Sequence, residues 1–290
     1  RIGMRLRGYR FSSDELVERW LDHVFDGVKH FLPPLFQLLG QMEVYLAALA
    51  FGDLCASKGL RVCFPELVEE GGRRMRGLFN PLLIAEGTKP VPCDLEGDRF
   101  DTIHILTGPN SGGKTRLLQT IGITQLLAQG GFFVPAAEAR LRPASGLFVS
   151  LVGISEPRPE LGEGRLGTEL IRIRRMFETS KPEALVILDE FCSGTNPSEG
   201  EEIFYLVLTL LGELRPEVFI STHFLEFTRR LSKESSPLNL AYLQVELDES
   251  QRPTYGVGQG VAITSLAAQT AARLGVTREE LMALIQKNRR

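Results

Sequence analysis

The sequence predicts an α/β protein with a mixed, largely parallel β-sheet flanked by helices, and three apolar stretches that end in polar residues carry this prediction. Ile103–Thr107 leads into a glycine-rich turn and then a helical pattern. Ala184–Leu188 ends in two carboxylates, and Val218–Ile220 ends in a serine, a threonine and a histidine. Continuous apolar runs are typical of strands buried on both faces, as in parallel sheets. The carboxyl ends of parallel strands meet at one edge of the sheet, so these polar residues should lie together there.

The turn after the first strand fits the phosphate-binding pattern G-x-x-x-x-G-K-[ST]. Glycines let successive backbone N–H groups face a phosphate that side chains would otherwise block. Lys114 supplies a charge for the β- and γ-phosphates, Thr115 offers a hydroxyl to Mg²⁺, and a helix from Lys114 to about Gln129 turns its positive end toward the same anion. The sequence therefore predicts a site for ATP or ADP with Mg²⁺, formed by Gly108, Pro109, Asn110, Ser111, Gly112, Gly113, Lys114 and Thr115.

Asp189 and Glu190 follow the second strand, and beside a phosphate loop they form a Walker B pattern. Asp189 is expected to hold Mg²⁺ directly or through water, and Glu190 to polarise the attacking water as general base. The third strand ends at Ser221, Thr222 and His223, residue types that can reach a γ-phosphate or its water. The predicted catalytic residues are Lys114, Glu190 and His223, and the predicted metal ligands are Thr115 and Asp189.

The rest of the chain reads as helices and short strands around this site. Ser12 and Glu15 form a capping box for an amphipathic helix that Pro33 stops, and a second helix runs from about Leu35 to Lys58. Residues 60–92 break into short extended pieces punctuated by prolines, which suits edge strands packed on the sheet. The glycine-rich and proline-rich stretch 153–167 favours a mobile loop beside the nucleotide, and a helix is expected over 168–179.

The last third of the chain holds a small-residue turn, a strand pair and two helices. The turn Gly194-Thr195-Asn196 precedes a helix whose N-terminus is free to face a phosphate, in this chain's own site or in a partner's. Residues 239–246 alternate as a strand, and 252–258 could pair back on it. Helices over 265–274 and 278–287, the latter opened by a capping box of Thr277 and Glu280, form a helix-turn-helix whose mixed charge favours packing over DNA reading.

Composition sets the outer limits. With 290 residues and 43% apolar content, one principal domain with helical additions is expected. The net charge of −3 gives no overall basic field, so nucleic-acid contacts must come from a local patch or from other parts of the protein. Four cysteines and four histidines show no metal-ligand spacing. No apolar run reaches the length expected of a membrane span, and the first residues are too polar for a secretory signal. We therefore expect a cytoplasmic protein. We also expect a fragment of a longer chain, because the sequence opens on Arg1 in the middle of a pattern.

Four segments together resemble the ATPase end of the MutS family of DNA mismatch-repair and recombination proteins, an offshoot of the ABC-type ATPases. The lysine-threonine ending of the phosphate loop and the run 196–200 are similar to the bacterial anti-recombination branch. The resemblance extends from about Met42 to Arg290, with the leading helices similar to the end of the family's lever arm. The segments are Thr107–Thr115, Gly131–Ala136, Leu188–Thr195 and Ser221–His223.

The resemblance implies a homodimer joined through the ATPase domains. Each ATP would lie between one chain's phosphate loop and the other chain's turn of Gly194, Thr195 and Asn196, while DNA is held mainly by clamp and lever domains that these residues lack. The mismatch-reading and small nuclease domains of relatives are absent as well. Asn196 and Pro197 stand where mismatch sensors carry hydroxyl residues, so either Asn196 or Ser198 could make the contact to the partner's site.

The expected organisation is a helical lever fragment over 1–58, a P-loop ATPase domain over 59–262 and a helical dimerisation unit over 263–290. The expected function is Mg²⁺-dependent ATP hydrolysis that drives a MutS-like DNA-binding dimer in mismatch repair or recombination control, with no membrane partner. The alternative is a nucleotide-gated assembly module acting on ribosomes or RNA. A small-molecule kinase is disfavoured, because no lid or acceptor pocket is visible and the Asp189-Glu190 pair suits water activation.

Overall fold

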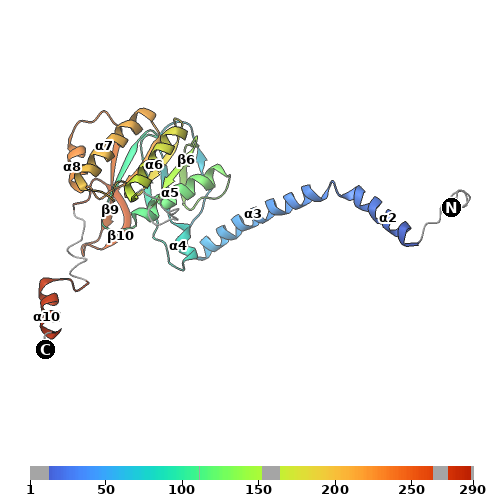
Figure 1. Ribbon diagram of the computed structural model, residues 1–290, viewed down its shortest axis with the longest axis horizontal. Helices are drawn as coiled ribbons and strands as arrows, with labels where there is room; N and C mark the ends of the chain where they lie inside the picture. The colour runs from blue at the N-terminus through green and yellow to red at the C-terminus, as the bar shows by residue number, and fades with distance from the viewer. Residues whose placement is uncertain (1–12, 111, 152–163, 264–273, 289–290) are drawn as a thin grey trace, which may run out of the picture. The chain divides into compact units, whose positions relative to one another are not determined.

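The computed structural model describes residues 13–110, 112–151, 164–263 and 274–288 (Figure 1). The chain divides into two compact units, residues 1–57 and 58–290. The candidate site residues lie in the second unit, which also holds both β-sheets.

The first unit contains two helices, α2 (Ser13–Val28) and α3 (Leu32–Ser57). Both helices were expected, but the second begins three residues earlier than predicted, so that Pro33 and Pro34 lie in its first turn. Proline is tolerated there because the first N–H groups of a helix have no intrahelical partner. Cys55 is the one buried residue of the described part of this unit.

Helix α3 corrects one expectation from the sequence. Its 26 residues are long and apolar enough to cross a membrane by length and composition, with a mean hydropathy of 1.3 over the most apolar window. Length and composition are weak support for a membrane span, because the core helix of a soluble protein or a signal sequence passes the same test. The sequence did not indicate an apolar stretch of this length because Glu43 and Asp53 divide it into shorter apolar runs.

The main sheet has six strands in the order β10-β9-β4-β8-β7-β6. Five of them run parallel, and β10 pairs antiparallel with β9. The expected pairing of 239–246 with 252–258 is therefore confirmed as the antiparallel edge of the sheet. The bounds are β4 (Ile103–Thr107), β6 (Leu147–Ser150), β7 (Leu185–Leu188), β8 (Glu217–Ser221), β9 (Leu240–Leu247) and β10 (Pro253–Gln259).

Helices cover both faces of this sheet because successive residues of each buried strand point to opposite sides. On one face, Ile187 of β7 and Phe219 of β8 share a core with helix α5 (Lys114–Gln129). On the other face, Val186 and Ile220 share a core with α6 (Arg165–Thr179), α7 (Pro197–Leu214) and α8 (Leu225–Lys233). The described part of the ATPase unit is thus an α/β sandwich with a largely parallel sheet, as predicted.

The short extended pieces after residue 60 form a sheet of their own, which corrects the expectation of edge strands on the main sheet. Its order is β1-β5-β2-β3, and β5, from beyond helix α5, pairs antiparallel with β2. Met75 and Leu78 of β2 pack into the core on the α5 side. A short helix, α4, was not predicted and follows β2. The bounds are β1 (Glu66–Leu67), β2 (Arg74–Leu78), α4 (Pro81–Ala85), β3 (Cys93–Glu96) and β5 (Glu138–Leu141).

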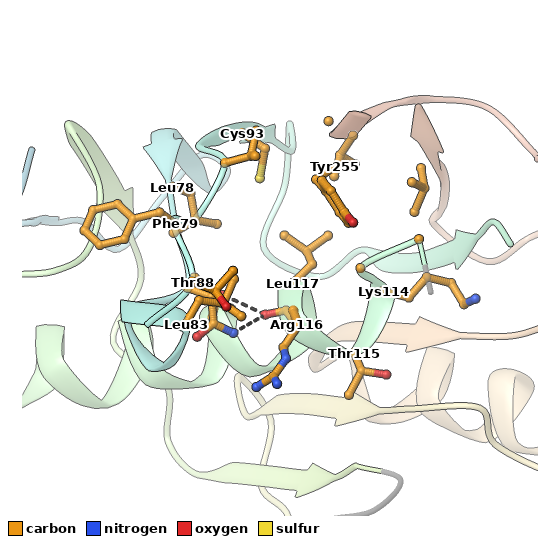
Figure 2. A pocket seen from close by; sticks show the side chains of 18 of the residues that line it. Leu78, Phe79, Leu83, Thr88, Cys93, Lys114, Thr115, Arg116, Leu117 and Tyr255 are labelled. Carbon is orange, nitrogen blue, oxygen red and sulfur yellow. Dashed lines mark hydrogen bonds between the residues drawn. The ribbon is translucent and has the colours of Figure 1, made fainter. Parts of the chain in front are cut away.

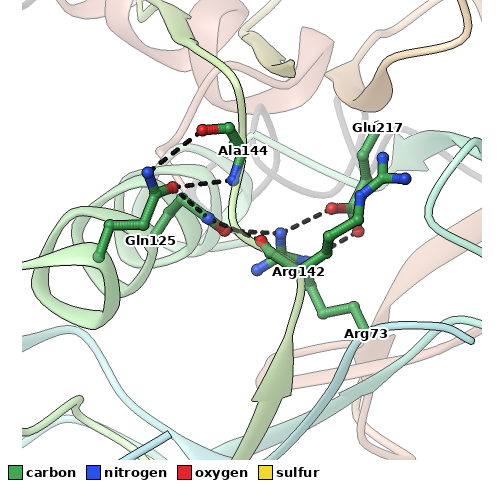
Figure 3. A network of polar contacts seen from close by, with 6 residues as sticks. Arg73, Gln125, Arg142, Ala144 and Glu217 are labelled. Carbon is green, nitrogen blue, oxygen red and sulfur yellow. Dashed lines mark hydrogen bonds and ion pairs between the residues drawn. The ribbon is translucent and has the colours of Figure 1, made fainter. Parts of the chain in front are cut away.

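A buried polar network joins the small sheet to the main one (Figure 3). Arg73, just before β2, binds both carboxylate oxygens of Glu217 at the start of β8, with N–H···O distances of 2.8 and 2.6 Å between heavy atoms. Its guanidinium also donates to Gln125 of α5 at 2.8 Å. Gln125 in turn donates to the carbonyl of Arg142 after β5. These bonds fix how the small sheet sits on the helix that follows the phosphate loop.

At the end of the chain the structure describes one of the two expected helices, α10 (Arg278–Asn288). One half of its predicted capping box is confirmed, because the Glu280 N–H donates to the Thr277 hydroxyl at 3.3 Å. The Glu280 carboxylate accepts a bond from that hydroxyl at 2.8 Å. The helix expected over 265–274 and most of the loop expected over 153–167 lie outside the described residues. Helix α6 begins at Arg165, three residues earlier than predicted.

Candidate nucleotide-binding and active site

The turn between β4 and α5 has the backbone that the phosphate-loop pattern predicts. Gly108 and Gly113 have φ of 150° and 94°, in the region where side chains are strained. A Cβ added to Gly112 would lie 2.9 Å from the carbonyl oxygen of Pro109, which is too close. Glycine is therefore required at each of these positions for a local reason. Ser111 lies outside the described residues.

Lys114 begins α5 and folds back over this turn. Its side chain is 4% exposed, and its ammonium donates to the carbonyls of Gly108 at 2.9 Å and Pro109 at 3.1 Å. Burial lowers the pKa of Lys114, while the carboxylates of Glu190 and Asp189 oppose that shift. The amine thus lies inside the loop, close to the two carboxylates that act on its pKa.

Three side chains, those of Thr115, Asp189 and Ser221, meet where the carboxyl ends of β7 and β8 approach the start of α5. The hydroxyl of Thr115 donates to Asp189 Oδ2 at 2.7 Å, and that of Ser221 donates to Asp189 Oδ1 at 2.6 Å. The Ser221 hydroxyl also accepts the backbone N–H of Glu190 at 2.8 Å. The sequence prediction that polar residues after parallel strands would meet is confirmed at this point. Ser221, which is fully buried, takes the central place in the contact.

The expected metal ligands, Thr115 and Asp189, are thus in direct contact, and each presents a hard oxygen. Mg²⁺ is commonly held by one or two protein oxygens together with phosphate oxygens and water. The donor set of one hydroxyl and one carboxylate fits that chemistry.

A cavity of about 420 Å³ opens beside the phosphate loop, and Figure 2 shows the side chains around it. Its polar end is formed by the loop, Lys114, Thr115 and Glu190. Its other end is mostly apolar, with residues from the β2-α4 segment, β3 and β10. The apolar lining is Leu78, Phe79, Leu83, Val91, Cys93, Leu117, Val245, Tyr255 and Val257. A polar end joined to an apolar end suits a ligand with phosphates and a flat ring.

Tyr255 is a cavity residue that the sequence did not single out. It lies on β10 where the pairing with β9 is irregular, and its φ is 63°, unusual for a tyrosine. A Cβ added to Gly113 would lie 3.1 Å from Cδ1 of Tyr255, so the ring rests against the phosphate loop. The nearby Asn80 was missed as well. Its amide donates to the Arg116 carbonyl at 2.9 Å, which ties the start of α4 to α5.

Several predicted residues do not line the cavity, among them Gly108, Pro109 and Asp189, although Asp189 contacts the lining residue Thr115. His223 is exposed after β8, with its ring edge-on to Phe224 at 5.7 Å between centroids, and it does not line the cavity. Gly194, Thr195 and Asn196 lie at the N-terminus of α7 and do not line it either. The Asn196 side-chain carbonyl oxygen caps that helix by accepting the Ser198 N–H at 3.3 Å.

Strand order, phosphate loop and paired carboxylates together define a P-loop ATPase domain. A family model described as MutS domain V matches residues 104–287, which is 184 of the 290 residues. The chain belongs to this family of ATPases. The resemblance noted in the sequence is therefore confirmed.

Curated relatives carry the name Endonuclease MutS2. The protein of Thermomicrobium roseum is 33% identical over 95% of this chain and 35% of its own length. The proteins of Halothermothrix orenii and Thermus thermophilus are 31% and 29% identical over 95% and 97% of this chain. The chain spans about a third of the length of these relatives. An alignment over 95% of the 290 residues leaves out about 15 of them, and helix α3 begins only at Leu32, so these alignments include helix α3.

Proposed function

We propose that this chain is the ATPase module of a MutS-like protein that hydrolyses ATP with Mg²⁺ and works on DNA in mismatch repair or recombination control. The observation that carries the proposal is the contact of Thr115 with Asp189, because Thr115 and the neighbouring Glu190 both line the cavity. The family assignment supports the ATPase activity and a role in DNA repair. The kind of DNA structure that this chain acts on, and the partners it works with, are also part of the proposal.

In this proposal each polar residue has one task. The N–H groups of the loop 108–113 and the Lys114 ammonium bind the phosphates, which replace the carbonyls that Lys114 contacts now. Thr115 and Asp189 hold Mg²⁺, which when bound neutralises charge that develops on the phosphate oxygens. Glu190 accepts a proton from the attacking water. Ser221 holds the Asp189 carboxylate and the Glu190 backbone at fixed positions through its two hydrogen bonds.

The apolar end of the cavity suits the adenine ring. Tyr255 offers an aromatic face beside the phosphate loop, and the half-buried Leu83 of α4 and Cys93 of β3 offer apolar surface from the small sheet and its connection. A flat base buried between such groups gains area-dependent and stacking energy without needing a charged partner. The small sheet therefore has a function in nucleotide binding as well as in packing.

We propose that the module works as a homodimer in which the turn before α7 completes the partner's site. Gly194 and Asn196 are exposed and lie outside this chain's own cavity, which supports a task in another subunit. Asn196 uses its side-chain carbonyl oxygen for the cap, so its amide N–H₂ group is left for a partner's phosphate, which favours Asn196 over Ser198 as the contact. Light scattering of Glu190→Gln should show a doubling of mass when ATP is added, and a monomer at high concentration with ATP would exclude this part.

Four further parts of the proposal come from the sequence. The domains are 1–58, 59–262 and 263–290, and the division between compact units after Ser57 supports the first boundary. His223 remains a candidate to sense the γ-phosphate, through rotation of its exposed side chain. We also propose that the protein acts in the cytoplasm. DNA is held mainly by regions that are outside these 290 residues.

Phosphate release by this chain tests the proposal and its alternative. We expect turnover that needs Mg²⁺ and stops when EDTA is added. In the longer protein, branched or mismatched DNA should raise the rate more than ribosomes do. Stimulation by ribosomes alone would favour the assembly module, and ATP binding without any phosphate release would argue against an ATPase.

A further inference from the structure

We infer that Glu169 on helix α6 is a positioning residue, which holds the turn carrying Glu190 in the shape that aims its carboxylate into the cavity. The inference rests on the proposed function, because Glu190 is the general base assigned there. Oε2 of Glu169 accepts a hydrogen bond from the backbone N–H of Cys192 at 3.0 Å. This bond connects α6 to the turn that follows β7, two residues beyond Glu190.

The turn needs to be held because its backbone is strained. Glu190 and Cys192 have φ of 49° and 61°, in the left-handed region that residues other than glycine avoid. Such residues persist only where the surrounding structure enforces them, and they gather at functional sites. The structure therefore has to supply contacts that fix both residues.

Glu169 supplies one of these contacts with a strong acceptor. Cys192 is fully buried, so its N–H cannot reach bulk water and needs a partner inside the protein. A carboxylate makes a shorter and stronger bond to an N–H than a neutral oxygen does. Burial first, and the Glu169 charge second, raise the pKa of the Cys192 thiol to about 12, which agrees with a carboxylate close by. Losing Glu169 would leave the buried N–H without this acceptor.

Contacts from two other elements fix the rest of the turn. Ser221 of β8 accepts the Glu190 N–H at 2.8 Å. On the α7 side, a Cβ added to Gly200 would lie 3.1 Å from the Cys192 carbonyl oxygen, so the helix packs closely against the turn. Glu169 thus completes a set in which β8, α7 and α6 each hold the turn from one side. Without the α6 contact, the Cys192 end is free to rotate, and Glu190 moves with it.

The expected effect on catalysis is a loss in turnover and not in binding. Glu169 does not line the cavity, so it makes no contact with the phosphates or the base. A shift of a catalytic group by about 1 Å can cost about 100-fold in rate. We therefore expect Glu169→Ala to lower kcat by about 10-fold or more. The ATP dissociation constant should stay within about twofold of the wild type, since the binding residues are unchanged.

The experiment compares four variants by ATP binding, by phosphate release and by hydrogen exchange of the peptide around Cys192. Glu169→Ala and Glu169→Asp should both lose turnover and exchange faster, because neither reaches the Cys192 N–H. Glu169→Gln should stay near the wild type, because its amide oxygen can accept the same bond. Glu178→Ala is the matched control on the same helix, where the exposed Glu178 pairs with Arg174 at 2.9 Å.

Several results would overturn the inference. They are a Glu169→Ala variant with normal kcat or normal exchange, a parallel loss of ATP affinity and kcat, and a Glu169→Gln variant as impaired as Glu169→Ala. Adding Glu169→Ala to Glu190→Gln should lower the residual rate no further, because Glu169 acts through Glu190. If Glu190→Gln keeps the wild-type rate, the proposed general base is wrong, while the exchange data still decide whether Glu169 holds the turn.

Discussion

The hydroxyl of Thr115 donates to the carboxylate of Asp189 at 2.7 Å, although the two residues are 74 positions apart in the sequence. Thr115 comes from the first turn of α5 and Asp189 from the end of β7, so the bond joins the phosphate loop to the paired carboxylates. It pairs two oxygens of the kind that Mg²⁺ prefers, and one of the two residues, Thr115, lines the cavity. This contact brings the two sequence motifs into a single site.

Replacing Lys114 by alanine should weaken ATP binding by about 10- to 100-fold, because a charge-assisted contact to phosphate is lost. Titration with a fluorescent ATP analogue gives the dissociation constant. Lys181→Ala is the control, since this lysine is exposed beyond the end of α6 and does not line the cavity. Wild-type affinity in Lys114→Ala would show that the ammonium does not contact the nucleotide.

Replacing Tyr255 by alanine should weaken the binding of ATP and ADP equally, by roughly 2- to 10-fold, because the proposed site places the base, and not the γ-phosphate, against its ring. Tyr205→Ala is a closely matched control. The two residues are 50% and 47% exposed, but Tyr205 lies on α7 away from the cavity. If Tyr255→Ala and Tyr205→Ala bind ATP with equal affinity, Tyr255 does not contact the nucleotide.

The two motifs and the strands that present them could be predicted because each is a local pattern. Tyr255 could not, because the pairing of β10 with β9 was predicted but the register shift at Tyr255 and its φ of 63° were not. Asn80 could not, because it reaches the cavity through a contact between distant segments, α4 with α5. The small sheet escaped prediction for the same reason, because its strand β5 follows α5 in the sequence. At the end of β8, the sequence favoured His223, whereas the structure brings Ser221 to Asp189. Ser221 is the last residue of the strand, and His223 lies beyond it, where the regular strand geometry no longer holds.

Removing the charge of one member of the buried pair Arg73 and Glu217 should lower the free energy of unfolding. Glu217→Gln leaves the guanidinium without its charge partner, and removing one member of a buried pair typically costs about 3 to 5 kcal/mol. Urea unfolding gives the free energy of unfolding. Glu96→Gln is the control, because its pairing with Arg74 is about half exposed and should contribute less than about 1 kcal/mol.

The combined variant Arg73→Met with Glu217→Leu separates charge from packing. It should recover much of the stability that Glu217→Gln loses, because no unpaired charge stays buried. If Glu217→Gln itself is as stable as the wild type, the pair does not hold the small sheet on the main one. If the combined variant is the least stable of all, the hydrogen bonds to Gln125 matter more than the charges.

His104 should make the folded protein less stable in mild acid. Its buried ring stacks on Phe219, and burial lowers its pKa from 6.5 to about 4, with Glu217 opposing the shift and Arg73 adding to it. The unfolded chain takes up the proton below pH 6.5, and the folded chain only near pH 4. Stability that is present above pH 6.5 is therefore lost as the pH falls, by roughly 2 kcal/mol at pH 5.

His104→Phe keeps a ring against Phe219 and cannot be protonated, so its free energy of unfolding should fall less between pH 7 and pH 5. The same replacement at the exposed His223 serves as the control and should leave the pH dependence as in the wild type. Urea unfolding at both pH values checks this. Identical pH dependence in His104→Phe and the wild type would mean that another group causes the loss.

The most direct test of the proposed function is ATP binding and phosphate release by Glu190→Gln, measured side by side with the wild type. We predict that the variant binds ATP with wild-type affinity, because Glu190 acts on the attacking water and not on the bound phosphates. Its phosphate release should fall by at least about 100-fold, the usual contribution of a general base. Phosphate release at the wild-type rate in Glu190→Gln would contradict the assignment of Glu190 as the catalytic base.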